Sequence, residues 1–281
     1  MSRIVYVNGH YLAEAEAKVS VFDRGFLFAD GVYEVSSVIH GRLVDNAAHL
    51  KRLQRSMAEL KIDFPMTIEE IEAIQIEMLS RNGLEEGVLY LQVTRGAADR
   101  DFGHPDNPEP SLVMFTQAKQ LLDNPSARKG MFVISVDDIR WRRRDIKTVQ
   151  LLAPSLAKQM ATEAGADDAW LIEDGLVTEG TSNNAWIIKG GKLITRHLSS
   201  DILHGITRRA VLRLAQEEGI VFEERAFSID EAKQADEAFV TSASAFVMPV
   251  VKIDDKLIGN GNPGAVTSRL RDLYIQEAKR S

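Results

Sequence analysis

Short apolar runs separated by turn residues dominate the first 45 residues of the chain. Pairs such as Asn8-Gly9 and His40-Gly41 separate these runs and favour tight hairpins between antiparallel strands. The pattern therefore predicts that the protein begins with an antiparallel sheet. Four segments are expected to be its first strands: 4–7, 11–12, 32–39 and 42–44.

Two helices are predicted to follow these hairpins. Asn46 is expected to be the N-cap of a helix that runs to Leu60. Thr67 and Glu70 have the spacing of a capping box in front of an apolar, periodic run that ends at Gly83. Further strands are expected at 88–94 and 112–116, separated by the polar, proline-rich loop 96–110. This loop is long enough to suggest a function.

A domain boundary is predicted at 118–130, around the turn-forming residues 123–126. The expected organisation is a smaller N-terminal domain at 1–117 and a larger C-terminal domain at 131–281. The expected C-terminal elements are strands at 131–136, 169–172, 185–189, 192–195, 221–224, 238–241 and 247–253, and helices at 154–164, at 207–218 and from about Pro263. Hairpins and helices that do not alternate strictly indicate an α+β fold, not a doubly wound parallel sheet.

Composition excludes several kinds of chemistry. The chain has no cysteine, which rules out disulfides, thiolate nucleophiles and zinc-thiolate sites. With 34 Lys and Arg against 41 Asp and Glu, the net charge of −7 argues against a nucleic-acid partner, because binding phosphates requires a basic face. The basic cluster 140–144 is too short to change this expectation. No segment resembles a signal sequence or a membrane span of roughly 20 apolar residues, so we expect a cytoplasmic protein without a membrane partner.

Two possible cofactor motifs are rejected. Residues 259–264 spell G-x-G-x-x-G in front of a helix, but the chain ends at Ser281 without the second strand and acidic residue of a dinucleotide site. The six histidines are dispersed, with no pair at helical spacing, so we expect no metal centre.

Small polar clusters beside turns are more promising. The segments 179–183, 205–207 and 241–244 together resemble an anion-binding cradle, because a helix N-terminus and neighbouring hydroxyls can bind phosphate. For any single cluster, ordinary turn and capping chemistry is the simpler explanation. A suitably placed lysine would change this balance.

Lys147 is the candidate lysine, since it lies in an apolar-rich stretch after the arginine cluster. An apolar setting favours the neutral amine of a lysine, which can then form a Schiff base with a carbonyl cofactor. From the local sequence alone, a surface lysine is the more common case. Lys158, the alternative, lies in the middle of a predicted helix and is better explained as part of its solvated face.

The chain resembles the fold-type IV pyridoxal-phosphate enzymes, and among them the D-amino acid transaminases. Eight blocks carry the resemblance along nearly the whole chain: 23–25, 30–35, 49–53, 90–96, 145–147, 177–180, 205–208 and 239–242. The resemblance implies a two-domain α+β fold, a homodimer, and pyridoxal 5′-phosphate held chiefly by the C-terminal domain.

The resemblance also implies roles for individual residues. Lys147 would form the Schiff base and move the substrate proton. Glu179 would face the pyridine nitrogen, and Arg52 would contact the phosphate. The remaining cofactor contacts would come from Leu203, Ile206, Thr207, Ser242 and Ala243.

Substrate recognition is the point at which the sequence departs from the family. A tyrosine matching Tyr33 and a loop arginine matching Arg100 would bind the substrate carboxylate. The family loop usually reads Arg-x-His, whereas this chain has Arg100-Asp101-Phe102, with the nearest histidine at His104. We therefore expect Phe102 to alter the binding of the carboxylate.

The leading functional hypothesis is transfer of an amino group from a D-amino acid, such as D-alanine or D-glutamate, to 2-oxoglutarate or pyruvate. The same fold leaves open a branched-chain L-amino acid transaminase, an (R)-amine transaminase and aminodeoxychorismate lyase. A protein that binds the cofactor or a small anion without turnover is a further alternative, which a catalytic Lys147 argues against.

Overall fold

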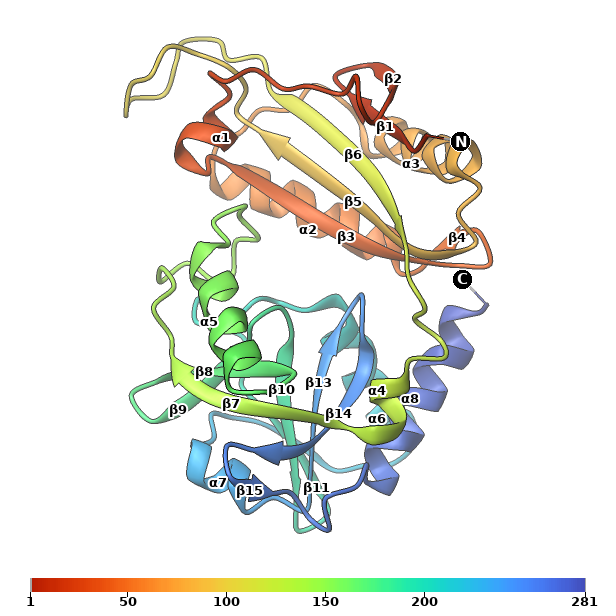
Figure 1. Ribbon diagram of the computed structural model, residues 1–281, viewed down its shortest axis with the longest axis vertical. Coiled ribbons are helices and arrows are strands. Elements are labelled where there is room, and N and C mark those ends of the chain that lie inside the picture. The colour runs from red at the N-terminus through yellow and green to blue at the C-terminus, as the bar shows by residue number, and fades with distance from the viewer. Residues whose placement is uncertain (1, 281) are drawn as a thin grey trace. The chain divides into compact units, whose positions relative to one another are not determined.

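A computed structural model describes residues 2–280 of the protein, and its strands form two separate sheets (Figure 1). Two units divide the described chain. The N-terminal unit comprises the residues up to Gln120 together with Ile146–Gln150, and the C-terminal unit comprises Leu121–Asp145 and Leu151–Arg280. The predicted division at 118–130 stays a prediction, and the segment predicted there as a linker contains a short helix, α4 (Pro125–Lys129).

An antiparallel sheet of six strands, in the order β2-β1-β6-β5-β3-β4, is the framework of the N-terminal unit. Helices α2 and α3 lie on one face of this sheet (Figure 1), where Leu50, Leu53, Ile71 and Met78 are almost completely buried. The elements in chain order are β1 (Ile4–Val7), β2 (His10–Ala13), α1 (Arg24–Phe28), β3 (Gly31–Ile39), β4 (Arg42–Leu43), α2 (Asn46–Glu59), α3 (Ile68–Asn82), β5 (Glu86–Thr94) and β6 (Ser111–Ala118).

The C-terminal unit is built on a nine-stranded sheet with both parallel and antiparallel pairs. Its order is β12-β11-β10-β13-β14-β7-β8-β9, with β15 paired to β14. Helices α6 and α8 pack against each other, and α8 covers β14. The elements are α4, β7 (Met131–Asp137), α5 (Leu152–Glu163), β8 (Asp168–Glu173), β9 (Leu176–Gly180), β10 (Asn184–Lys189), β11 (Lys192–Thr195), α6 (Ile206–Glu217), β12 (Phe222–Glu224), α7 (Ile229–Lys233), β13 (Glu237–Ser242), β14 (Phe246–Ile253), β15 (Lys256–Leu257) and α8 (Ala265–Ala278).

The capping box of α3 is confirmed. The Thr67 hydroxyl accepts from the Glu70 N–H, and the Glu70 carboxylate accepts from the Thr67 N–H. The N-cap predicted for α2 is wrong, because Asp45 occupies that position. The Asn46 side chain is buried and makes tertiary hydrogen bonds, accepting from Ser36 and donating to Glu72 and Gln75.

The last helix also begins differently from the prediction. Gly264 is the N-cap of α8, so the helix begins after Pro263 and not at it. The Glu237 carboxylate, from β13, accepts from the N–H groups of Val266 and Thr267 at 3.1 and 2.8 Å. A carboxylate distant in sequence therefore satisfies this helix start, which local capping rules cannot reveal.

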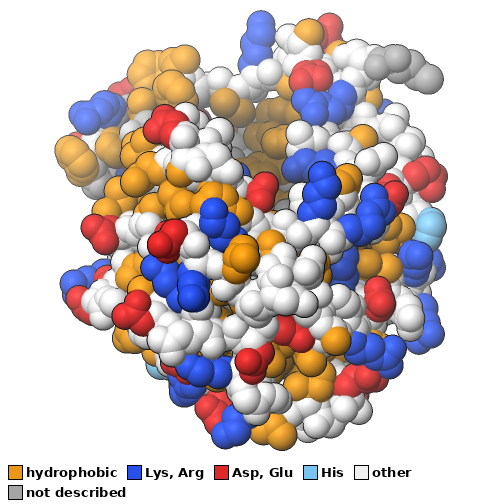
Figure 2. All heavy atoms as spheres, turned by 60° about the horizontal axis from the view of Figure 1, so that its bottom comes forward, with side chains coloured by type: hydrophobic (Ala, Val, Ile, Leu, Met, Phe, Trp, Pro, Cys, Tyr) orange, Lys and Arg blue, Asp and Glu red, His pale blue; other side chains and the backbone are white. Residues whose placement is uncertain are grey.

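The mixed α+β architecture agrees with the predicted fold class. Among residues 2–280, no helix is both long and apolar enough to cross a membrane. On the face shown in Figure 2, basic and acidic side chains are interspersed.

Candidate functional site

Lys147 lies on a short segment that extends the sheet of the N-terminal unit. The Tyr33 N–H donates to the Lys147 carbonyl, and the Val149 N–H donates to the Gly31 carbonyl, each at 3.0 Å. Thr148 forms an isolated antiparallel bridge with Val32. Because Ile146 is buried in the core of the same unit, the backbone of Lys147 is fixed along the edge of β3.

The amine of Lys147 lies against an aromatic surface. Its Nζ atom is 4.1 Å from the ring centroid of Tyr33. Tyr33 stacks on Tyr90 at 5.5 Å between centroids, and Tyr90 stacks on Phe115 at 4.7 Å. Burial raises the pKa of the Tyr90 hydroxyl above its ordinary value. The structure thus places Tyr33, predicted to bind substrate, beside the predicted catalytic lysine.

Arg52, predicted to bind the cofactor phosphate, is buried in the same unit. Its guanidinium donates from Nε to Oε1 of Glu34 at 2.7 Å and from Nη2 to Oε2 at 2.8 Å. His49 Nδ1 is 2.8 Å from Oε2 of the same carboxylate. Burial by itself would raise the pKa of Glu34, but Arg52 and His49 together lower it to about 2. The carboxylate is therefore ionised at neutral pH.

The loop with Arg100 and Phe102 lies against α1. The guanidinium carbon of Arg100 is 5.5 Å from the ring centroid of Phe28 and 5.6 Å from that of Phe102. Arg24 is buried, and it holds the loop by donating to the carbonyls of Asp101 and Gly103. Phe102 itself is 80% exposed, so its ring is accessible in the single chain.

Glu179 ends a hairpin in the C-terminal unit and is buried. Arg140 donates to its Oε1 at 2.5 Å, while the Asn184 amide and the Leu203 N–H donate to its Oε2 at 3.0 and 3.1 Å. Arg140 also pairs with Asp138. Both Glu179 and Asp138 raise the pKa of the Arg140 guanidinium against the lowering by burial, so its charge is permanent. These donors fix both oxygens of the Glu179 carboxylate.

Asn184 connects the polar clusters that the sequence singled out. Besides Glu179, its amide donates to the Leu203 carbonyl at 3.0 Å, and β-sheet pairing places it opposite Thr241. A Cβ atom on Gly205 would lie 2.0 Å from the Asn184 Oδ1, so this close approach requires glycine. The structure therefore brings all three clusters of the predicted anion cradle into one region of the C-terminal unit.

One of these clusters is a helix start, and another is a tight turn. Helix α6 begins after Gly205 with no side-chain cap on its first N–H groups, and Ile206 and Thr207 are buried in its first turn. Ser242 ends β13, and its hydroxyl accepts from the Ala245 N–H at 3.2 Å across the turn that contains Ala243. An uncapped helix N-terminus beside such a turn suits an anion.

Arg140 and Asn184 are the residues that sequence reasoning missed. The sequence indicates Arg140 only as part of a short basic cluster, and its partner Glu179 lies 39 positions away. The strand that carries Glu179, β9, was missed as well. The Asp174-Gly175 pair could have indicated this strand, because such pairs favour a tight hairpin turn. In the structure the two residues have φ angles of +52° and +76° and form the turn between β8 and β9.

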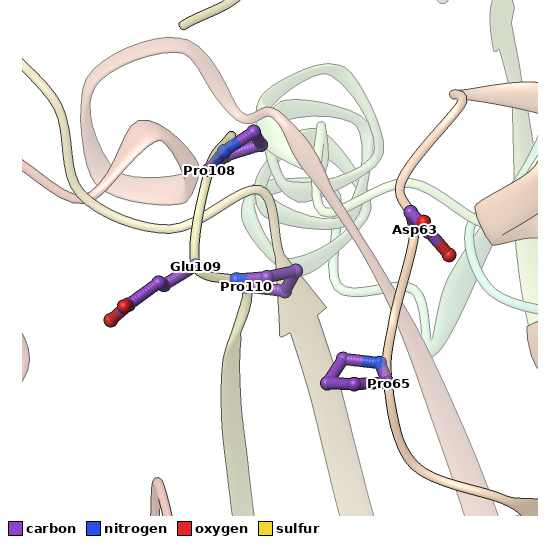
Figure 3. A pocket seen from close by; sticks show the side chains of 5 residues that line it. All are labelled: Asp63, Pro65, Pro108, Glu109 and Pro110. Atoms are coloured by element: carbon purple, nitrogen blue, oxygen red, sulfur yellow. The ribbon is translucent and has the colours of Figure 1, made fainter. Parts of the chain in front are cut away.

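A pocket with a volume of about 430 Å³ lies elsewhere in the N-terminal unit, as Figure 3 shows. It lies between the segment of Asp63 and Pro65 and the segment of Pro108 and Pro110, and the Glu109 side chain extends away from the other segment. No residue of the predicted site lines it. Among residues 2–280, no three His, Cys, Asp or Glu side chains are grouped so that they could hold a metal ion.

The donor set fits pyridoxal phosphate. Glu179 is a buried carboxylate suited to a protonated ring nitrogen, and the uncapped start of α6 is suited to a phosphate. Lys147 supplies a primary amine with a fixed backbone. Taken unit by unit, Glu179 and the start of α6 in the C-terminal unit suit the ring nitrogen and the phosphate of the cofactor, and Lys147 in the N-terminal unit supplies an amine suited to its aldehyde.

Sequence comparisons place the chain among aminotransferases. The pattern of the family described as Amino-transferase class IV matches residues 31–253. The D-alanine aminotransferase of Bacillus licheniformis is 41% identical over 267 residues, which cover 95% of this chain and 94% of that protein. The D-alanine aminotransferase of Staphylococcus haemolyticus is 39% identical over 272 residues, or 96% of each chain.

Solved structures show the same fold. A branched-chain amino acid aminotransferase from T.th., complexed with N-(5′-phosphopyridoxyl)-L-glutamate, is 27% identical with a TM-score of 0.91, covering 100% of this chain and 95% of that one. The branched-chain aminotransferase of Thermoproteus uzoniensis, with norvaline, is 26% identical with a TM-score of 0.87, covering 100% and 97%. These comparisons confirm the resemblance noted from the sequence.

Proposed function

Because this chain belongs to the class IV aminotransferase family, and is thus a pyridoxal-phosphate-dependent aminotransferase, we propose that it transfers the amino group of a D-amino acid to a 2-oxo acid. The observation that carries this proposal is the 37–41% identity to D-alanine aminotransferases over nearly the whole chain. Identity to the branched-chain enzymes named above is lower, at 26–27%. D-Alanine and D-glutamate are the proposed donors, with pyruvate and 2-oxoglutarate as acceptors.

The residue roles implied by the resemblance are proposals that the local geometry supports. When bound, pyridoxal phosphate supplies a ring that accepts the electron pair left when the substrate Cα loses its proton. Lys147 would take that proton with its Nζ amine and pass it to the former aldehyde carbon of the cofactor, so that the amine is again a base when the half-reaction ends. Glu179 holds a negative charge for the ring nitrogen, and Arg140 and Asn184 keep its carboxylate in one orientation.

The proposed phosphate ligands are Arg52 and the polar groups at 206–207 and 242–243, with Leu203 packing on the ring. For the substrate carboxylate we propose Tyr33 and Arg100. Phe102 cannot donate a hydrogen bond, in contrast to the histidine usual at this position, and it presents an apolar surface instead. The carboxylate would therefore depend mainly on the Arg100 guanidinium.

The substrate proposal is tested with purified enzyme, 2-oxoglutarate and either D-alanine or L-alanine. We expect pyruvate to form from D-alanine about 100-fold faster than from L-alanine, since misplacing a bound group commonly costs a factor of this order. The readout is pyruvate released per unit time for the two alanines, and 2-oxoglutarate consumed per unit time for other donors. Faster turnover of L-leucine would indicate the branched-chain reaction, and turnover of (R)-1-phenylethylamine alone would indicate an amine transaminase. Pyruvate released from aminodeoxychorismate without an acceptor would indicate the lyase.

We also propose that the enzyme is a homodimer. Apolar side chains gather at 19–26, where Val19, Val21, Phe22 and Phe26 are all exposed in the single chain. Exposed apolar groups of this size commonly mark a protein interface. Sedimentation analysis should give twice the mass of the chain, and Phe26→Asp should shift the equilibrium toward the monomer. A single-chain mass at assay concentrations would contradict the proposal.

The expected cytoplasmic location stays a prediction, which cell fractionation would test.

A further inference from the structure

Glu34 lies on β3 next to Tyr33 but points to the opposite face of the sheet. Successive side chains of a strand alternate between the two faces, so Tyr33 faces Tyr90 while Glu34 faces α2. His49 and Arg52 are three positions apart on α2 and both reach the Glu34 carboxylate. The three side chains form a buried cluster, with exposed fractions of 1% for Glu34, 3% for His49 and 8% for Arg52.

The hydrogen bonds of this cluster define the direction of the Arg52 guanidinium. Its Nε and Nη2 atoms each donate to a different oxygen of Glu34, at 2.7 and 2.8 Å. A guanidinium is planar, so fixing two of its nitrogens fixes the whole group. His49 contacts the same carboxylate and limits its rotation.

The cluster is poorly explained as a device for stability. Removing a carboxylate and a guanidinium from water costs several kcal/mol per ion, and apolar residues of similar volume often stabilise a core as well or better. A buried ion pair that fixes one functional side chain has a different benefit. Because the side chain is already ordered, it loses little conformational entropy when its ligand binds.

We propose that Glu34, supported by His49, is a positioning residue that orients the Arg52 guanidinium toward the phosphate of the cofactor. The inference rests on the proposed role of Arg52, but not on the preference for D-amino acids. Glu34 does not touch the cofactor in this proposal. Its effect on binding must therefore depend both on the phosphate and on Arg52.

The test compares two probes that differ only in the phosphate, pyridoxamine 5′-phosphate and pyridoxamine. Calorimetry measures their binding to the full-length chain freed of cofactor. For Glu34→Gln we expect the affinity for pyridoxamine 5′-phosphate to fall about 10- to 100-fold, the range that a hydrogen bond to a charged group contributes. The affinity for pyridoxamine should change less than about twofold. A structural role alone would weaken both probes equally.

A double-mutant cycle and a matched control complete the test. In an Arg52→Met background, Glu34→Gln should cause no further loss of preference for the phosphate form. Glu72→Gln removes another carboxylate that contacts α2, through Asn46, and should leave the preference unchanged. If Glu34→Gln does not fold, Glu34→Asp keeps the charge and leaves Arg52 intact but shortens the side chain that makes the two-point contact, and the same selective loss is expected from it.

Three results would overturn the proposal. They are an unchanged preference in Glu34→Gln, an equal loss for both probes, and additive effects in the cycle. For Glu34→Asp, an unchanged preference or an equal loss for both probes would do the same. These outcomes are independent of the substrate assay, because an enzyme that prefers L-amino acids would still bind the two probes as expected.

Discussion

Replacing Lys147 by alanine is expected to lower the rate of transamination by about 10⁴-fold or more, since proton transfer by a positioned side chain alone contributes up to about that factor. The amine is also the group proposed to hold the cofactor through its aldehyde. The measurement is pyruvate formation from D-alanine, compared with the wild-type enzyme at equal protein concentration. Part of the activity should return when methylamine is added, because the added amine can replace the lost proton carrier.

The fold should tolerate this change. The hydrogen bonds that fix the segment along β3 involve the main chain of Lys147 and Val149, and alanine preserves them. The free energy of unfolding should change by less than about 1 kcal/mol, as is usual away from buried, bonded side chains. Lys158→Ala is the matched control, since Lys158 is an exposed lysine on α5 that contacts Asp167 and Asp168. Full activity in Lys147→Ala would refute the catalytic role.

Replacing Glu179 by glutamine is expected to have the second largest effect. Glutamine keeps the shape and can still accept from Asn184 and Leu203. Its NH2 group then faces Arg140 and loses that hydrogen bond, and glutamine has no charge to stabilise a protonated ring nitrogen. A preorganised charge or dipole in a buried site is worth about 10²–10³ in kcat. We therefore expect kcat to fall by about 100-fold or more, with a smaller change in the KM for D-alanine. Steady-state kinetics measure both constants.

Glu173→Gln is the matched control for this substitution. Glu173 lies in β8, the strand paired with β9, and it forms an ion pair with Arg144, but no site role is proposed for it. Its replacement should leave kcat within about twofold of the wild type, because glutamine keeps the shape of this half-buried side chain and can still accept from Arg144. If Glu179→Gln retained the wild-type kcat, the ring nitrogen would not depend on this carboxylate.

Local sequence patterns predicted most helices and strands, because the residues that favour each element lie within it or directly beside it. The capping box at Thr67 was correct, and so was the strand 192–195, since the signals lie within a few positions. Asn46 misled the prediction because its amide has partners on α3, 26 and 29 positions away. Partners that distant cannot be identified from a local pattern.

The candidate site likewise combines residues that the sequence indicated with residues that only the structure reveals. The resemblance predicted roles for Lys147, Glu179 and Arg52, but it did not indicate the side chains that hold Glu179 and Arg52 in place. Arg140, Asn184 and Glu34 act through contacts between elements that fold together only in three dimensions. Geometry was needed to distinguish these supporting residues from ordinary charged or polar positions.

The segment Ile146–Gln150 also covers part of the edge of the sheet in the N-terminal unit. β4 pairs only with the end of β3, at Val38 and Ile39, so without this segment the backbone groups at 31–33 would form an open edge. Unpaired strand edges promote aggregation by pairing with other chains. A fragment ending at Gln120 would lose this cover together with Lys147, because the stretch that carries the proposed catalytic amine also completes the sheet. A requirement for the Lys147 amine and a requirement for a covered sheet edge would then both constrain the same five residues, Ile146–Gln150.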